Sequence, residues 1–371
     1  MVNNHLLAMT MEELDSQISK IDPKLYGQTR NHLDGAVTHL SAYFTHGILS
    51  PVDILDQIVS KHGAEQCGKL ASEFAWREYF QRVWQSRGDE IFADLKQAQE
   101  MVEYEQMPEA ISDSNISCGI DVLDDSVREL VTKGYLHNHS RMWIAGVVTN
   151  IGRTHWKKPA AWMFYHLLDG DLASNTLSWQ WVAGSFSHKK YIANQENLNQ
   201  YSKTSQQGTW LDMSYEELAE RDLPRELSER CVLQLENHYP ESTVEKVNNT
   251  DHLLLYSIWN LDTNWHRSSD ARRILVIEPS VYDRCPMSPK RWEFIMLWAS
   301  QIAGLEIFVG ELDDLLPDEY NGEITYKEYP LSNHWPGKEE PRSWIFPKTQ
   351  GYYPSFSKYY KTAKKQTNKG I

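Results

Sequence analysis

The stretch between residues 134 and 181 constrains this chain more than any other, because it combines aromatic, charged and amide side chains at helical spacing. Within it, Asp171, Asn175 and Trp179 follow one another at intervals of four residues, which places them on one face of a helix. A helix that only filled a core would carry leucine, isoleucine or valine there. A face with a carboxylate, an amide and an indole is better suited to binding a flat aromatic ligand with polar edges.

The length of 371 residues allows a large helical domain with a smaller companion, and a hydrophobic content of 41% excludes a largely disordered chain. We expect a cytoplasmic protein without a membrane anchor, because no apolar run is long enough to cross a bilayer and the N-terminus lacks the features of a signal peptide. The four cysteines lie far apart and form no CxxC pair, which indicates reduced thiols. No metal site is expected, with a site built from these scattered cysteines as the alternative.

The net charge of −14 argues against a nucleic-acid ligand, but the distribution of the charges changes that conclusion. Residues 134–205 carry seven basic side chains against three acidic ones, and residues 341–371 carry seven basic side chains and no acidic one. An acidic protein with two basic regions can still steer a polyanion to one face. For the C-terminal region alone, a solvated basic tail is the preferred interpretation.

A second helical stripe lies between residues 68 and 85, where Glu73, Trp76, Arg77, Phe80 and Trp84 fall on one face. Aromatic stripes usually belong to a core. A carboxylate and a guanidinium within such a stripe need a partner if they are buried, so this face is expected to line a site.

Several local patterns predict the remaining elements. The capping boxes that begin at Thr10 and Ser214 open helices, and Ser50 followed by a proline opens another, where ordinary capping without a ligand is preferred. Residues 185–208 read as a surface loop and residues 216–250 as an acidic helical segment. Strands at 272–278 and 305–309 enclose a helix at 288–304, which is a βαβ unit. It has no glycine fingerprint, so no dinucleotide is expected there, and it should dock on the helical part.

Three blocks of sequence in one order carry a resemblance to a known family. THLSAYFTHGILSP, EFAWREYF, and LHNHSRM with LLDGDLASNTLSWQW resemble the FAD-binding helical domain of the photolyase/cryptochrome family. The resemblance implies a mainly α fold, with a photolyase-like helical FAD-binding domain over residues 1–265. A small C-terminal α/β (βαβ) unit and a basic tail are expected over residues 266–371.

The usual member of this family has an α/β antenna domain before the helical domain. In this chain the helical motifs begin close to the N-terminus, so the resemblance is to a short member that lacks the antenna domain. No antenna chromophore is therefore expected, and light capture would depend on FAD alone.

The resemblance also assigns residues to the cofactor FAD. The segment from Thr38 to Ser41 would meet the diphosphate, with His39 at a position where the family often has arginine. Asn175 would face flavin N5, and an ion pair of Arg141 with Asp169 would lie beside the isoalloxazine ring. The full set of cofactor-binding positions is Tyr26, Thr38, His39, Leu40, Ser41, Arg77, Asn138, Arg141, Asp169, Asp171 and Asn175.

Two further groups of positions follow from the same resemblance. Trp179 and Trp156 match the first two members of the electron-relay chain. No tryptophan occupies the third place, where Tyr104 or another tryptophan is the alternative. Glu73, Trp76, Met142 and Trp181 match the lesion cavity of enzymes that repair cyclobutane pyrimidine dimers. Indoles can stack on flipped bases, and a carboxyl group can hydrogen-bond a base edge.

The resemblance therefore implies a DNA photolyase, a carbon–carbon lyase that uses FAD and light to repair pyrimidine dimers, most readily of the cyclobutane type. The expected partner is UV-damaged DNA, single- or double-stranded, and the protein is expected to be a monomer. A blue-light photoreceptor of the cryptochrome type without repair activity is the alternative. A flavin-binding relic with neither activity is the third interpretation.

Overall fold

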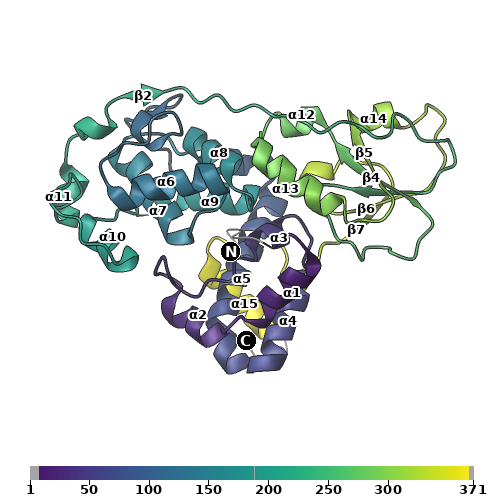
Figure 1. The fold of residues 1–371 in the computed structure, drawn as a ribbon, viewed down its shortest axis with the longest axis horizontal. Coiled ribbons are helices and arrows are strands. Elements are labelled where there is room, and N and C mark those ends of the chain that lie inside the picture. Colours follow the sequence, from purple (N-terminus) through teal and green to yellow (C-terminus); the bar gives the residue numbers. More distant parts are fainter. Residues whose placement is uncertain (1–7, 188, 367–371) are drawn as a thin grey trace, which may run out of the picture.

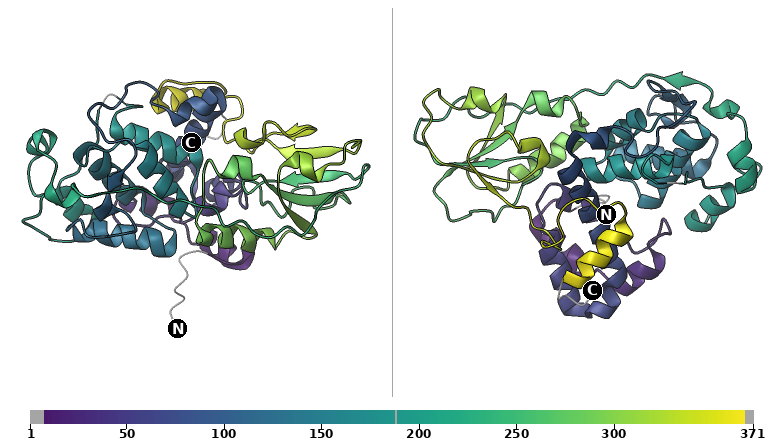
Figure 2. Two further views of the ribbon diagram at one scale, coloured as in Figure 1. Left: turned by 90° about the horizontal axis from the view of Figure 1, so that it is seen from above. Right: turned by 180° about the vertical axis from the view of Figure 1, so that it is seen from behind.

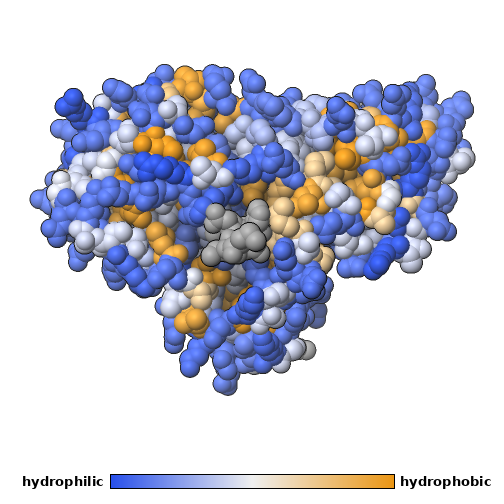
Figure 3. Space-filling model, viewed as in Figure 1, coloured by the Kyte–Doolittle hydropathy of each residue, from blue (hydrophilic) through white to orange (hydrophobic). Residues whose placement is uncertain are grey.

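Three lobes surround a common centre in the computed structural model, which describes residues 8–187 and 189–366 (Figure 1). One lobe contains the N-terminal helices, a second contains the helices of the middle of the chain, and the third is built on a β-sheet. Apolar side chains lie near the centre, where the lobes meet, and also in smaller patches on the middle and sheet lobes among mostly hydrophilic surface (Figure 3). The centre is therefore where the lobes pack together.

Helices dominate the first two thirds of the chain, as expected for a mainly α protein. They are α1 (Met11–Ser19), α2 (Pro23–Thr29), α3 (Ser41–Thr45), α4 (Pro51–His62), α5 (Ala64–Arg87), α6 (Asp121–Lys133), α7 (Asn138–Gly146), α8 (Lys157–His166), α9 (Leu172–Ala183), α10 (Gln195–Ser202) and α11 (Tyr215–Glu220). Short helical turns follow at η1 (Gly88–Phe92), η2 (Glu109–Ile111), η3 (Val147–Ile151) and η4 (Arg225–Leu227), and β1 (Met107–Pro108) pairs with β2 (Arg230–Cys231).

The helix starts confirm the predicted caps at Thr10, Ser50 and Ser214, although the capping box predicted at Thr10 is incomplete, because the Glu13 carboxylate accepts from the Met9 N–H. Thr10 accepts a hydrogen bond from the Glu13 N–H at the start of α1, and Ser50 accepts one from the Asp53 N–H at the start of α4. Ser214 forms a complete capping box with Glu217. Each side chain satisfies an N–H group that has no partner within its helix, which fixes where the helix begins.

The sheet of the third lobe is larger than the predicted βαβ unit. β4 (Arg272–Ile277), α13 (Pro289–Ala299) and β5 (Leu305–Val309) form that unit, with the two strands parallel, as predicted. The other strands are β3 (Leu253–Tyr256), β6 (Ile324–Lys327) and β7 (Lys338–Glu340), and the order is β5-β4-β3-β6-β7, all parallel. The short elements α12 (Pro279–Tyr282), α14 (Leu312–Leu315) and η5 (Pro330–Ser332) complete the lobe. Such an order is that of a doubly wound sheet.

The last helix, α15 (Phe356–Gln366), leaves the sheet and packs on α5, as the view from behind shows (Figure 2). The buried Glu78 carboxylate of α5 holds the chain that leads to it, accepting hydrogen bonds from the backbone N–H groups of Ile345 and Phe346 and from the Tyr359 hydroxyl. We propose the division at residue 265 as the domain boundary, with two exceptions: β3 lies before it and α15 joins the helical part.

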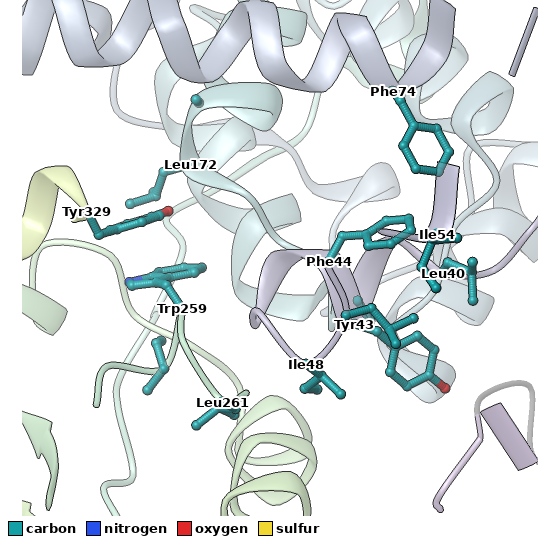
Figure 4. Packing of buried hydrophobic residues seen from close by; sticks show 14 of the residues in the cluster. Leu40, Tyr43, Phe44, Ile48, Ile54, Phe74, Leu172, Trp259, Leu261 and Tyr329 are labelled. Atoms are coloured by element: carbon teal, nitrogen blue, oxygen red, sulfur yellow. The ribbon is translucent and has the colours of Figure 1, made fainter. Parts of the chain in front are cut away.

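One hydrophobic core joins the helical and α/β parts, which confirms the expected docking. Phe44 and Phe74 from the helical part and Trp259 and Tyr329 from the sheet lobe belong to the same cluster (Figure 4). Trp259 and Tyr329 stack with their ring centroids 4.9 Å apart. These rings follow β3 and β6 and fill the junction between the two parts.

Two sequence predictions about local structure are wrong. Residues 221–250 are mostly extended rather than helical, because Pro224 and Pro240 interrupt a helix and alternate side chains from Cys231 to Leu235 turn inwards, a period of two. This segment crosses from the middle lobe to the sheet along one edge of the molecule (Figure 1). The predicted surface loop at 185–208 contains α10, which Asn194 caps by accepting from the Asn197 N–H.

Candidate functional site

Arg141 and Asp169 form the ion pair that the sequence predicts. Arg141 lies on α7, and its Nη2 is 2.9 Å and 2.8 Å from the two carboxylate oxygens of Asp169. Its Nε donates to the Leu136 carbonyl at 2.9 Å, which fixes the plane of the guanidinium. The Asp169 side chain is 8% exposed, so the pair is largely shielded from water and its electrostatic field is strong.

Asp171 brings α9 and α5 together. Its carboxylate caps α9 through the Ser174 N–H at 2.8 Å, and it accepts from Gln81 Nε2 at 2.8 Å and pairs with Arg77 Nη2 at 3.5 Å. Burial raises the pKa of this carboxyl, but the charge of Arg77 and the hydrogen bonds from Ser174 and Gln81 outweigh burial and hold the pKa below its ordinary value. Asp171 is therefore a buried anion at neutral pH.

Asn175 lies one turn further along α9, as the spacing predicts. Its amide nitrogen donates to the Ala160 carbonyl of α8 at 2.8 Å, and the side chain is half-buried. Between it and Asp171, the Ser174 side chain lies beside the Asp171 carboxylate and helps to lower its pKa.

Trp179 and Trp156 belong to one hydrophobic cluster and are 2% and 1% exposed. Trp156 Nε1 donates to Asp94 Oδ1 at 2.6 Å. Hydrogen bonds from Trp156, Ser185 and His155 outweigh burial and lower the pKa of Asp94, so the indole N–H meets a carboxylate. The His155 ring lies 5.3 Å from Trp156, and Tyr104 stacks on His155 at 4.5 Å with 49% of its surface exposed. A row of rings thus connects the buried Trp156 to the surface.

The segment from Thr38 to Ser41 leads into α3, and its residues differ in burial and in hydrogen bonding. The Thr38 carbonyl accepts from Gln17 Nε2 at 2.8 Å, and Leu40 is fully buried. His39 has a φ of 53°, a left-handed conformation that a non-glycine residue rarely adopts, and its Nδ1 is buried without a partner among the described residues. Burial lowers the pKa of His39, so the ring is neutral and cannot replace the charge of an arginine.

A hollow of about 660 Å³ lies beside this segment, between it and α1. Thr38 and His39 line one side, and Glu12 and Glu13 line the other. Asp22 and Lys20 also line the hollow, so its carboxylates outnumber its one amine. This excess of negative charge repels a diphosphate, and we do not assign the hollow to the cofactor.

Trp76 points away from the side of α5 that carries Arg77, and Glu73, one turn before Arg77, has other partners than Arg77 has. Glu73 Oε1 is 3.4 Å from Arg30 Nη1 and 3.3 Å from Lys69 Nζ. The burial of Tyr26 on α2 raises the pKa of its hydroxyl, and the negative charge of Glu73 raises it further. The indole of Trp76 stacks on Phe356 of α15, with centroids 3.9 Å apart and an interplanar angle of 12°. One face of this indole is therefore covered by the chain itself.

The other predicted site residues lie apart from these contacts. Met142 is half-buried on α7, Asn138 is exposed at the start of that helix, and Trp181 is 38% exposed on α9. Among the described residues, no hydrogen bond or ring contact joins Glu73 or Trp76 to them. The structure thus gathers five of the predicted cofactor residues around the start of α9, namely Arg77, Arg141, Asp169, Asp171 and Asn175. Tyr26, the segment 38–41 and Asn138 lie on other elements, and no hydrogen bond or ring contact among the described residues joins the predicted lesion-cavity residues of α5 to those of α7 and α9.

Sequence analysis missed four polar residues near the site. Gln81 lies one turn after Arg77 on α5, and this spacing could have identified it. Asp94, His46 and Arg291 have no local signal, because their partners are distant in the sequence. Within the described part of the chain, no group of three or more His, Cys, Asp or Glu side chains could hold a metal ion, and no helix is both long and apolar enough to cross a membrane.

Comparison with known proteins identifies the same region. The FAD binding domain of DNA photolyase matches residues 70–255. A deoxyribodipyrimidine photo-lyase of Streptomyces griseus is 28% identical over 155 residues, which cover 40% of this chain and 32% of that protein. A cryptochrome DASH of Gloeobacter violaceus is 28% identical over 174 residues, which cover 43% of this chain and 34% of that protein. The chain therefore spans about a third of the length of these curated relatives.

Solved structures of similar proteins include a Synechocystis cryptochrome, with a TM-score of 0.43 and 21% identity over 53% of this chain and 44% of that one. A bacterial class III photolyase from Agrobacterium tumefaciens has a TM-score of 0.40 and 23% identity, covering 52% of this chain and 42% of that one.

Proposed function

Because this chain belongs to the photolyase/cryptochrome family through its FAD-binding domain, we propose that it repairs pyrimidine dimers in DNA with light. FAD is the cofactor of this domain, and when bound it supplies light absorption and one-electron redox chemistry. The observation that carries the proposal is the meeting of two ionic groups at the start of α9. These are the Arg141–Asp169 pair and the buried Asp171 with its donors Arg77 and Gln81.

The residues present fit FAD, because a flat ring with polar edges needs both charged groups and donors at fixed positions. Arg77, Arg141, Asp169, Asp171 and Asn175 would hold it. The task of these side chains is to orient the cofactor and to hold fixed charges beside it in a largely water-free site.

For the lesion, we propose that Trp181 offers an exposed indole on which a flipped base stacks, and that Glu73 hydrogen-bonds a base edge. Stacking on an indole contributes about 1–3 kcal/mol per base. Trp76 would line the side of the lesion cavity with its free face, because Phe356 already covers the other face of the indole. We propose cyclobutane dimers as the substrate, with UV-damaged DNA as the partner.

We further propose that Tyr104 is the surface end of the electron relay that begins at Trp179 and Trp156. The stacked His155 bridges Tyr104 and Trp156, and Asp94 stabilises positive charge that develops on the Trp156 indole. In Tyr104→Phe, light-driven reduction of the oxidised protein by a thiol should be several-fold slower, because phenylalanine is much harder to oxidise. Transient absorption at the tyrosyl wavelength measures the step, and an unchanged rate would contradict it.

We also propose that the sheet lobe carries no antenna chromophore. Ligands of doubly wound sheets bind where the strand order reverses, between the carboxyl ends of the first and fourth strands, here β3 and β6. Trp259 and Tyr329 fill that place with their stacked rings (Figure 4). This arrangement supports a protein without an antenna chromophore at the switch point.

A blue-light receptor without repair activity is the second candidate, and one observation favours it. The helix α15 covers Trp76, so the C-terminal segment is directly coupled to the helix that carries Glu73 and Arg77. Such a contact could transmit a change at the cofactor to a partner.

The deciding experiment illuminates a thymine-dimer oligonucleotide with FAD-loaded, reduced protein and measures restored thymines by chromatography. Repair requires restored thymines in blue light and none in darkness. If light restores none although FAD is bound and reduced, the repair proposal fails and the receptor proposal gains support.

A further inference from the structure

The connection between α8 and α9 carries both carboxylates of the candidate site, so its position decides where they lie. Asp169 and Asp171 flank Gly170 in this connection. On the side of the helical part, the Leu168 N–H donates to the Gly134 carbonyl at 2.8 Å, and the Thr45 hydroxyl donates to the Asp169 carbonyl at 3.2 Å. The opposite side of the connection faces the α/β part.

Arg291 holds the connection from that opposite side. This residue of α13 is fully buried, and its Nη1 donates to the Phe164 carbonyl at 3.1 Å while its Nη2 donates to the Gly170 carbonyl at 2.6 Å. The guanidinium also lies 4.4 Å from the centroid of the Phe164 ring. One side chain thus fixes the end of α8 and the last residue before Asp171.

The contact with Arg291 requires a glycine at position 170. A Cβ added at residue 170 would lie 2.4 Å from Arg291 Nη1 and 3.0 Å from the Phe164 carbonyl oxygen. The glycine therefore permits the close approach of the guanidinium to the backbone. The contact with Arg291, which belongs to the α/β part, explains why a glycine stands between Asp169 and Asp171.

A buried guanidinium is costly unless its charge is compensated. The structure records no ion pair between Arg291 and any described carboxylate, and its Nε has no hydrogen-bond partner among the described residues. Burial lowers the pKa of Arg291 to about 10, and the charges of Asp169 and Asp171 oppose that shift, so the side chain stays a cation at neutral pH. Cys285 and Tyr329 also oppose the shift, but burial raises the pKa of both groups and keeps them neutral at neutral pH. The compensating negative charges are therefore the carboxylates of Asp169 and Asp171.

We propose that Arg291 is a positioning residue of the FAD site, through which the α/β part sets the location of Asp169 and Asp171 and contributes a positive charge behind them. The inference rests on the proposed function, because it concerns the same FAD site. It explains why the sheet lobe is tightly joined to the helices: it completes the cofactor site from behind.

The test compares FAD dissociation constants and flavin midpoint potentials of the purified protein and its variants, with thermal unfolding of each. In Arg291→Met, FAD binding should weaken by about tenfold, the effect of losing hydrogen bonds to a charged group. The midpoint potential should become more negative, because a positive charge near the cofactor is lost. Arg291→Lys keeps the charge but not the two-carbonyl fork, so affinity should fall while the potential stays close to that of the unchanged protein.

Two further variants keep the test decisive. Gly170→Ala displaces the guanidinium without removing it and should weaken FAD binding even if Arg291→Met does not fold. Arg272→Met is the matched control, because Arg272 lies on β4 of the same lobe and pairs with Asp251 and Glu306 away from the site. It should lower the melting temperature and leave affinity and potential unchanged.

If Arg291→Met and Gly170→Ala lower only the melting temperature, Arg291 is structural and the inference is wrong, while the proposed function stands. If the unchanged protein is folded but takes up no FAD, the proposed function itself fails.

Discussion

Two faces of α5 make different kinds of contact with neighbouring helices. The face with Arg77 and Gln81 meets α9 through the Asp171 carboxylate, so it is organised by charge and hydrogen bonds. The face with Trp76 and Tyr79 meets α15 through stacked and edge-on rings, centred on Phe356. Charged contacts of the first kind hold groups at fixed positions for a ligand, whereas aromatic contacts of the second kind stabilise a junction. The same helix therefore serves a candidate cofactor site on one side and the C-terminal helix on the other.

The largest expected effect is on the charged face. Asp171→Ala removes the cap of α9 and the partner of Arg77, so the free energy of unfolding should fall by about 3 kcal/mol. FAD binding should be lost. Denaturant unfolding and FAD titration measure both quantities.

Asp53→Ala is the control for this variant, because Asp53 is an exposed acid in the first turn of α4. Its effect should stay within about 0.5 kcal/mol. If Asp171→Ala binds FAD as well as the unchanged protein does, the charged face is not the cofactor site.

A substitution on the aromatic face should lower the stability of the protein without changing its FAD affinity. Phe356→Ala removes the ring that stacks on Trp76, so the free energy of unfolding should fall by about 2 kcal/mol while FAD affinity stays unchanged. Tyr352→Ala, in the same segment but 41% exposed, is the matched control with a smaller effect. A clear loss of FAD affinity in Phe356→Ala would show that the two faces are not independent.

A pH titration sharpens the contrast, because only the charged face depends on an ionised carboxylate. The pKa of Asp171 is held below its ordinary value of 3.8, so its stabilising contribution is present above that value and is lost as the pH falls below it. The difference in unfolding free energy between the unchanged protein and Asp171→Ala should stay constant above about pH 5 and shrink in more acidic solution. A difference that is independent of pH would mean that Asp171 acts without its charge.

The smallest effect on stability is expected at Glu73, which is 25% exposed and shares its carboxylate between Arg30 and Lys69. Glu73→Ala should cost about 0.5 kcal/mol, as for other partly exposed ion pairs, and should keep FAD binding. It should nevertheless lower the number of dimers repaired per photon absorbed, measured with the thymine-dimer oligonucleotide. An unchanged repair yield would remove Glu73 from the proposed lesion cavity.

Sequence analysis predicted most of what depends on local spacing. The stripe on α9, the caps of α1 and α4, and the β4–α13–β5 unit follow from patterns within a few residues. The Arg141–Asp169 pair came from the family resemblance rather than from spacing. Grouping Trp76 with Arg77 on one face was less accurate, because neighbouring residues on a helix point about 100° apart.

What the sequence could not supply are contacts between distant segments. The short strands β3, β6 and β7 carry too few residues for a clear pattern. They become strands because each pairs with its neighbour in the sheet: β3 with the longer β4, β6 with β3, and β7 with β6. In the same way, nothing near Arg291 indicates that it reaches the carbonyl of Gly170, and nothing near Phe356 indicates that it covers Trp76. Such contacts are set by tertiary packing, which single-segment patterns do not report.

The most direct test of the central claim, a cofactor site at the start of α9, is the visible absorption spectrum of the purified protein after incubation with FAD and removal of the excess. We expect a yellow protein that carries FAD in a one-to-one ratio and releases it unmodified on heating, and a colourless Asp171→Ala variant. A folded protein that retains no FAD, or an Asp171→Ala variant that retains as much as the unchanged protein, would contradict it.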